Sequence, residues 1–151
     1  MRTKVGVIQM TSTADVEKNL EAVDRCVAMA AGDGAKLVVV PECFAYLGPE
    51  EGKLEIAEAL PAGGPILDRM AALARQRGVE LILGGFWEKG AGPKKVKNAC
   101  VHLDAKGAVR AVYRKIHLFD IDLPDGTCLS ESDTVEPGSE TVVTDTLFGK
   151  L

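Results

Sequence analysis

The chain has 151 residues, the length of one ordinary domain, and 46% of them are hydrophobic, which is enough to form a buried core. The formal net charge is −4 and no segment forms a basic stripe, which argues against nucleic acid and anionic membranes as partners. The start, Met1 to Lys4, leads into an apolar strand pattern without the long apolar stretch of a signal peptide, so we expect a cytoplasmic protein.

The amino-terminal third has the pattern strand, helix, strand. Residues 4–10 include β-branched residues typical of strands and predict the first strand. From Asp15 to Gly32, apolar residues recur at helical spacing and predict an amphipathic helix. Residues 37–40 are continuously apolar, as in a strand covered on both faces, and Pro41 ends that strand.

The middle third continues this alternation. We expect a short helix over residues 51–60, a second helix from Pro65 to Gly78, and a strand over residues 79–85. The charged and glycine-rich residues 88–97 predict an exposed loop.

The last third begins with a β-hairpin. Residues 99–103 and 108–115 are two strand patterns joined by a short turn sequence. Residues 116–138 have little periodicity and predict a long loop, of the kind that is usually functional. Two further strands are expected, over residues 141–144 and from Phe148 onward. The order of the elements indicates a single α/β domain.

Three side chains stand where chemistry could occur. Glu42 follows directly on the apolar strand 37–40, and ligands of open α/β sheets gather at the carboxyl ends of strands. Lys115 ends the second hairpin strand, and Glu131 lies in the long loop. From position alone each has a simpler interpretation: a carboxylate returning to solvent, an exposed edge lysine and a solvated loop acid. His117 is more simply a structural group.

The combination of motifs is more specific. A Pro-Glu-Cys-Phe sequence at 41–44, a Tyr-Arg-Lys-Ile-His sequence at 113–117, and Glu131 ahead of a Pro-Gly pair at 137–138 resemble the nitrilase superfamily of carbon-nitrogen hydrolases in order and approximate spacing. The Gly-Gly-Phe sequence at 84–86 makes the chain similar to the Nit branch, which contains deaminated glutathione amidases and omega-amidases.

The resemblance implies a four-layer α-β-β-α sandwich, of which residues 1–151 would form the amino-terminal half as one truncated domain. It also implies a Cys-Glu-Lys mechanism without metal or cofactor, in which a thiolate attacks an amide, ammonia leaves and water hydrolyses the thioester. Glu42 would move the protons, Lys115 would stabilise the oxyanion, and Glu131 would orient Lys115 or the substrate. The implied substrate is the amide of a small carboxylated molecule, deaminated glutathione-like or an omega-amide, and the implied full-length enzyme is a homo-oligomer.

None of the four scattered cysteines is expected to be the nucleophile, and without a C-x-x-C pair they favour neither a disulfide nor a zinc site. Cys43 neighbours Glu42, but adjacent side chains of an extended segment point to opposite sides. Cys26 and Cys100 are typical of buried packing thiols, and Cys128 of a bystander in the long loop. In the family the nucleophile follows the strand that the last residues would begin, so the resemblance places it beyond this chain.

A second hypothesis is a noncatalytic truncated domain that binds a partner chain or a ligand, with Glu42 and Lys115 as remnants. A nucleotide-binding α/β domain is disfavoured because the chain has neither a G-x-G-x-x-G nor a Walker sequence. A cut through a sandwich would expose an apolar sheet face and an unpaired edge. We therefore expect the isolated chain to be poorly soluble or oligomeric.

Overall fold

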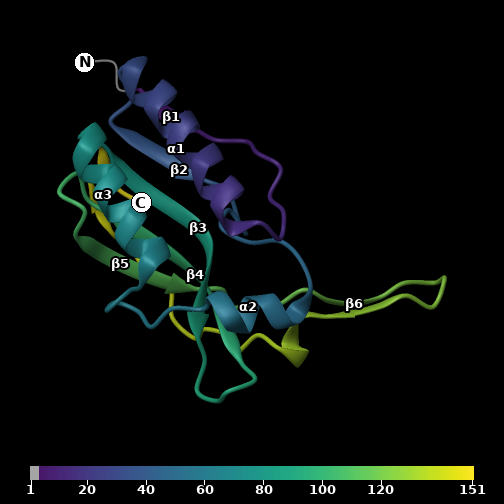
Figure 1. The fold of residues 1–151 in the computed structure, drawn as a ribbon. Helices are drawn as coiled ribbons and strands as arrows, with labels where there is room; N and C mark the ends of the chain where they lie inside the picture. Colours follow the sequence, from purple (N-terminus) through teal and green to yellow (C-terminus); the bar gives the residue numbers. More distant parts are fainter. Residues whose placement is uncertain (1–3) are drawn as a thin grey trace.

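A five-stranded sheet forms the body of the structure, a computed structural model that describes residues 4–151 (Figure 1). The expectation for the first three residues lies outside this range. The strands of the sheet are neighbours in chain order: β1 (Val5–Val7), β2 (Leu37–Val40), β3 (Glu80–Lys89), β4 (Val96–Leu103) and β5 (Val109–Arg114). The first three strands are parallel, and the last two add antiparallel. The α/β class predicted from the sequence is confirmed.

Helices fill the crossovers between the parallel strands: α1 (Val16–Gly32), α2 (Glu50–Ile56) and α3 (Pro65–Arg77). Helix α1 begins as expected, because the side chain of Asp15 accepts a hydrogen bond from the N–H of Lys18 at 3.1 Å. Helix α3 ends as expected at Gly78, whose φ of +62° is the left-handed conformation that glycine adopts easily.

Helices α1 and α3 cover one face of the sheet (Figure 1). Leu81 and Leu83 of β3 point into this core, while the alternate residues Glu80 and Ile82 point to the other face. The core also contains fully buried side chains from β2, β4 and both helices: Val38, Val40, Val101, Leu103, Val23, Val27 and Met70. Burial under the helices thus explains the apolar residues on that face, which are every second residue of a strand.

The second face of the sheet is only partly covered. The carboxyl-terminal segment crosses it and forms a small hairpin: β8 (Asp145–Thr146) and β9 (Gly149–Lys150). It is attached by Thr144, whose Oγ1 lies 2.8 Å from His102 Nδ1, and by the N–H of Leu147, which donates to Glu80 at 3.1 Å. At the β1 edge of the sheet, Val7 is 79% exposed. An apolar sheet surface is therefore open there, as expected.

Helix α2 ends earlier than expected, because the next segment turns to pair with β3. The N–H of Glu58 donates to the carbonyl of Trp87 at 3.0 Å. The buried carboxylate of Glu58 then accepts from the N–H groups of Ile66 and Leu67, at 2.6 and 3.1 Å, at the start of α3. A carboxylate that satisfies two free N–H groups at a helix start stabilises it by about 1 kcal/mol.

Two loop predictions are wrong. Strand β3 continues to Lys89 and β4 begins at Val96, so only residues 90–95 remain of the loop expected over residues 88–97. The segment 116–138 contains a two-stranded arm that projects from the body (Figure 1) and a short 3-10 turn: β6 (Asp120–Asp122), β7 (Cys128–Ser130) and η1 (Glu131–Asp133). The arm lacks an apolar pattern because nearly all of its residues are exposed.

The strand expected over residues 141–144 is also wrong, because β8 begins at Asp145 and only Thr144 of the expected range takes part in the hairpin, through two backbone hydrogen bonds of 2.9 Å with Leu151. The strand expected from Phe148 onward corresponds to β9. Within residues 4–151, no helix has the length and apolar character needed to cross a bilayer.

Candidate active site

The turn that carries Glu42 follows β2 at the carboxyl edge of the parallel strands. Its backbone docks on β3, because the N–H of Cys43 donates to the carbonyl of Gly85 at 3.1 Å. From the other side, the buried Asn19 of α1 donates through Nδ2 to the carbonyl of Ala45 at 2.9 Å. A strand and a helix therefore fix the position of Glu42.

Two glycines of β3 make room for this turn. A Cβ at Gly84 would lie 2.9 Å from the carbonyl oxygen of Val40, and a Cβ at Gly85 would lie 2.4 Å from Cγ of Glu42. Gly85 also has a φ of +63°, which favours glycine. The register between β3 and β4 shifts across this pair, so the glycines form a bulge against which the Glu42 turn rests.

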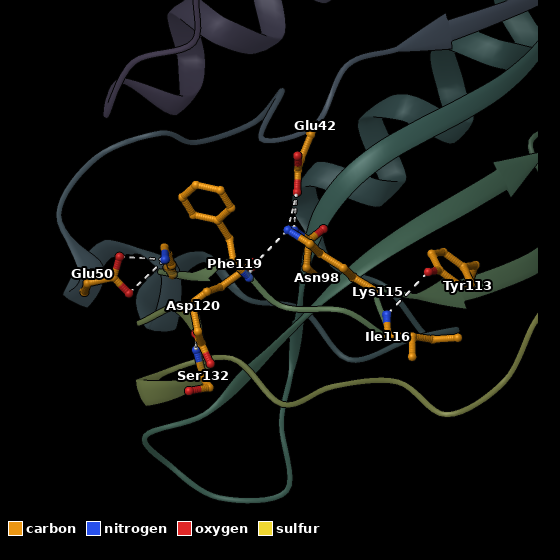
Figure 2. Close-up of polar contacts among 11 residues, drawn as sticks. Glu42, Glu50, Asn98, Tyr113, Lys115, Ile116, Phe119, Asp120 and Ser132 are labelled. Atoms are coloured by element: carbon orange, nitrogen blue, oxygen red, sulfur yellow. Dashed lines mark hydrogen bonds and ion pairs between the residues drawn. The ribbon is translucent and has the colours of Figure 1, made fainter. Parts of the chain in front are cut away.

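Lys115 follows β5 and brings its ammonium group to Glu42 (Figure 2). Nζ lies 3.3 Å from Oε1 of Glu42 and 2.9 Å from Oε2 of Glu131. The backbone of Lys115 is fixed on both sides, by donation to the carbonyl of Asn98 at 2.9 Å and by acceptance from the N–H of Gly138 at 2.8 Å. Burial lowers the pKa of Lys115, but the hydrogen bond to Glu131 and the charge of Glu42 outweigh burial and raise it. The ammonium therefore stays positive beside Glu42.

The two carboxylates around Lys115 differ in their freedom. The side chain of Glu131 is 13% exposed and also accepts from the N–H of Phe119 at 2.7 Å. Burial raises the pKa of Glu131, yet the hydrogen bonds from Lys115 and Phe119 outweigh it and keep the pKa below its ordinary value. Glu42 is 56% exposed and accepts from Nδ2 of Asn98 at 2.6 Å. Glu131 thus holds the lysine, while Glu42 remains open to a ligand.

These groups line one open cavity of about 400 Å³, a size suited to a small molecule. A second ion pair, between Lys53 and Glu50, contributes to the same wall. The remaining wall includes large apolar side chains: Leu47, Trp87, Phe119 and Leu129. The part of the chain that the structure describes has no group of three or more His, Cys, Asp or Glu side chains arranged to hold a metal ion.

Cys43 lines this cavity too, and it packs against the buried cluster that contains Trp87. Its φ is +56°, so the residue is not extended and side-chain alternation does not apply. Burial, followed by the charge of Glu42, raises the pKa of its thiol to about 11. A thiol with that pKa is protonated at neutral pH and is a poor nucleophile.

The other cysteines lie elsewhere. Cys26 and Cys100 are half-buried rather than fully buried, and Cys128 is exposed on β7. Cys26, a residue of α1, packs against the core, as expected. Burial raises the pKa of the Cys100 thiol, on the second face of the sheet.

Within the 113–117 motif, the neighbours of Lys115 serve other purposes. Arg114 makes two hydrogen bonds to Glu88, whose side chain is 7% exposed. That pair explains why Glu88 is buried although its sequence context predicted a loop. His117 is exposed and is not among the residues that line the cavity.

Comparison with known proteins decides the family. The family model for carbon-nitrogen hydrolases matches residues 4–151. The chain belongs to the carbon-nitrogen hydrolase family. Human deaminated glutathione amidase is 39% identical over 138 residues, which cover 89% of this chain and 42% of that protein. Deaminated glutathione amidase of Dictyostelium discoideum is 35% identical over 154 residues, which cover 98% of this chain and 53% of that protein.

A solved structure of this family has the same fold. The crystal structure of the C. elegans NitFhit protein matches with a TM-score of 0.86 and 31% identity, over 99% of this chain and 37% of that chain. The resemblance to the nitrilase superfamily is thus confirmed. The chain spans about half the length of the curated relatives it matches.

The structure brings together the three side chains singled out in the sequence, Glu42, Lys115 and Glu131. Two further polar side chains that line this cavity, Asn98 and Lys53, were not among the predicted site residues. The amide of Asn98 gave no signal of its contact with Glu42, which lies far away in the sequence. Lys53 carried a weak signal, since it follows Glu50 by three residues on a helix, and that spacing allows an ion pair.

Proposed function

We propose that residues 1–151 form one truncated carbon-nitrogen hydrolase domain that supplies the proton carrier and the oxyanion-binding lysine of an amidase. The observation that carries this proposal is the position of Lys115, with Nζ at 3.3 Å from Glu42 and 2.9 Å from Glu131 in an open cavity. A positive charge fixed beside a solvent-accessible carboxylate suits amide hydrolysis, which needs both charge stabilisation and proton transfer.

The proposed nucleophile is a cysteine encoded beyond Leu151. Glu42 accepts its proton, the thiolate attacks the amide carbonyl, and Lys115 stabilises the oxyanion. Glu42 then protonates the leaving nitrogen, which departs as ammonia, and removes a proton from the water that hydrolyses the thioester. Amide and water become carboxylic acid and ammonia, and the cysteine is regenerated. The proposal of an external thiol is supported by the burial of Cys43, which raises the pKa of its thiol, and by the share of the relatives that this chain covers, about half of their length.

The proposed substrate is the terminal or side-chain amide of a small carboxylated molecule, deaminated glutathione-like or an omega-amide. The curated relatives from human and Dictyostelium discoideum are deaminated glutathione amidases, and the open cavity of about 400 Å³ has a size suited to a small ligand. The proposed full-length enzyme is a homo-oligomer.

The test begins with the coding sequence after the Leu151 codon. We expect an in-frame continuation with a nearby cysteine, and we call its product the complete polypeptide. This product should release ammonia from omega-amides, and Glu42→Gln should abolish the release without changing the thermal melt. A reading frame that closes at Leu151, together with a purified chain that releases no ammonia, would contradict the proposal.

That contradicting outcome would favour the second candidate, a noncatalytic truncated domain that binds a partner chain or ligand. The exposed apolar side of β1, with Val7 at 79% exposure, is the observation in its favour. Clear turnover by residues 1–151 alone would instead exclude both the inert domain and the external cysteine.

A further inference from the structure

Lys53 is a second cation on the cavity wall, and the proposed mechanism gives it no role. It lies on α2, its side chain is 12% exposed, and its Nζ lies 4.8 Å from the centroid of the Trp87 ring. Trp87 is buried, and its indole N–H donates to the carbonyl of Tyr46 at 3.4 Å. Lys53 is therefore held on a fixed aromatic surface and borders the cavity, which places it well for binding an anion.

The two lysines of the cavity differ in how firmly their partners are held. Lys115 is shared by two carboxylates, of which Glu131 is anchored by a backbone N–H. Lys53 has one carboxylate partner, Glu50, whose oxygens lie 2.6 and 2.8 Å from Nζ and whose side chain is 55% exposed. Ion pairs with an exposed partner stabilise a protein by only about 0–1 kcal/mol. A ligand carboxylate can therefore share or replace Glu50 at the ammonium group, which has three donors.

Glu50 also has a second hydrogen-bond partner. Oγ1 of Thr134 donates to its Oε2 at 2.6 Å. If a ligand takes Lys53, Glu50 keeps this bond and stays hydrated. Displacement of Glu50 thus leaves no buried charge without a partner.

The wall between the two lysines is apolar. Trp87, Phe119 and Leu129 line it, and the last two are 55% and 46% exposed, so they are accessible to a ligand. In the view of Figure 2, Glu50 lies on one side of Phe119 and Lys115 on the other. A ligand that reaches both ends of this wall needs a hydrocarbon segment between two polar groups.

We propose that Lys53 binds the carboxylate of an omega-amide whose amide lies against Glu42 and Lys115, with Glu50 as the competing counterion. The spacer of the substrate packs on the apolar wall. This inference rests on the proposed amidase function and assigns the residue that distinguishes carboxylated from neutral amides.

The test compares two amides of equal chain length in the complete polypeptide: glutaramate, which carries a carboxylate, and pentanamide, which does not. Lys53→Met keeps the length of the side chain and removes its charge. We expect KM for glutaramate to rise about 10- to 100-fold, as for loss of a hydrogen bond to a charged group, with kcat and the KM for pentanamide nearly unchanged. The matched control, Lys18→Met, removes an exposed lysine of α1 and should change neither KM. An equal loss with both amides would overturn the proposal.

Glu50→Gln tests the same site by removing the carboxylate that competes with the substrate for Lys53. It stays informative if Lys53→Met fails to fold. Removing the competing charge should lower KM for glutaramate about threefold and leave pentanamide unaffected. A higher KM for glutaramate in this variant would contradict the assignment.

Calorimetric titration with glutarate separates this inference from the amidase proposal, because binding needs no nucleophile. Glutarate binding that is lost in Lys53→Met, in a protein that releases no ammonia, would keep the carboxylate site and reject the amidase. Ammonia release from glutaramate with the same KM in Lys53→Met would keep the amidase and reject the carboxylate site.

Discussion

Arg114 and Lys115 are adjacent cations, yet they make two different kinds of ion pair. Arg114 binds Glu88 through two hydrogen bonds, and the Glu88 side chain is 7% exposed. Lys115 is shared between Glu131 and Glu42, and the Glu42 side chain is 56% exposed. In the first pair the carboxylate is buried, whereas in the second the Glu42 carboxylate faces an open cavity. An ion pair alone therefore does not mark a candidate catalytic cation, and the accessibility of its carboxylate partner is what distinguishes Lys115 from Arg114.

The largest expected effect comes from Lys115→Met in the complete polypeptide. We expect kcat/KM for an omega-amide to fall about 10³-fold, because the charge that stabilises the oxyanion is gone. The thermal midpoint should fall by only about 2–4 °C, since Glu131 keeps its bond from the N–H of Phe119. Ammonia release and a thermal melt measure both. Activity within tenfold of the unmodified enzyme would contradict the catalytic role proposed for Lys115.

Arg114→Met should have the opposite result: a large loss of stability and little loss of activity. It leaves the buried carboxylate of Glu88 without its partner, so we expect the free energy of unfolding to fall by about 3 kcal/mol, measured by urea denaturation. The rate per folded molecule should stay within about threefold. Arg110→Met is the matched control, because Arg110 is an exposed residue of β5 and should change stability by less than about 0.5 kcal/mol.

Asn98→Ala tests the second hydrogen-bond donor to Glu42. The amide of Asn98 lies 2.6 Å from Glu42, and losing a hydrogen bond to a charged group costs about 2 kcal/mol. We therefore expect kcat to fall about 30-fold, less than in Lys115→Met. Steady-state kinetics at fixed pH decide this, and an unchanged kcat would mean that the hydrogen bond from Asn98 is not needed to position Glu42.

The smallest effect is the acid dependence of stability. The pKa of Glu131 in the folded protein lies below its ordinary value of 4.5, because hydrogen bonds from Lys115 and Phe119 outweigh burial. Its contribution is therefore present above about pH 4.5 and is lost as pH falls through the folded-state pKa. Urea denaturation from pH 6 to pH 3 should give a flatter profile for Glu131→Gln than for the unmodified protein. Parallel profiles would show that Lys115 does not favour the ionised form of Glu131.

The sequence predicted those elements whose signals are local. Helix α1 has its apolar periodicity and Asp15 at its start, and α3 has Gly78 at its end. The predictions failed where distant partners decide the structure. Glu88 is charged and looks like part of a loop, but Arg114 from β5 makes its burial in β3 favourable.

The candidate site was predictable to a similar degree. The resemblance of short motifs to the nitrilase superfamily, in order and approximate spacing, singled out Glu42, Lys115 and Glu131, whereas their positions alone favoured simpler interpretations. The position of Cys43 was not predictable, because its left-handed φ depends on contact with the bulge of β3. The place of Lys53 depends on Trp87, which is far from it in sequence.

Strand β3 links the core, the Glu42 turn and the cavity wall. Its leucines lie under the helices, its two glycines receive the Glu42 turn, and its Trp87 supports Lys53. Because side chains alternate along a strand, a slip of β3 by one residue would turn all of these groups to the wrong side together. Under the proposed function, a molecule with a misaligned β3 would lose the base, the cavity wall and the core packing at once. The specific activity of the complete polypeptide would then report the fraction of molecules in which β3 has the correct register.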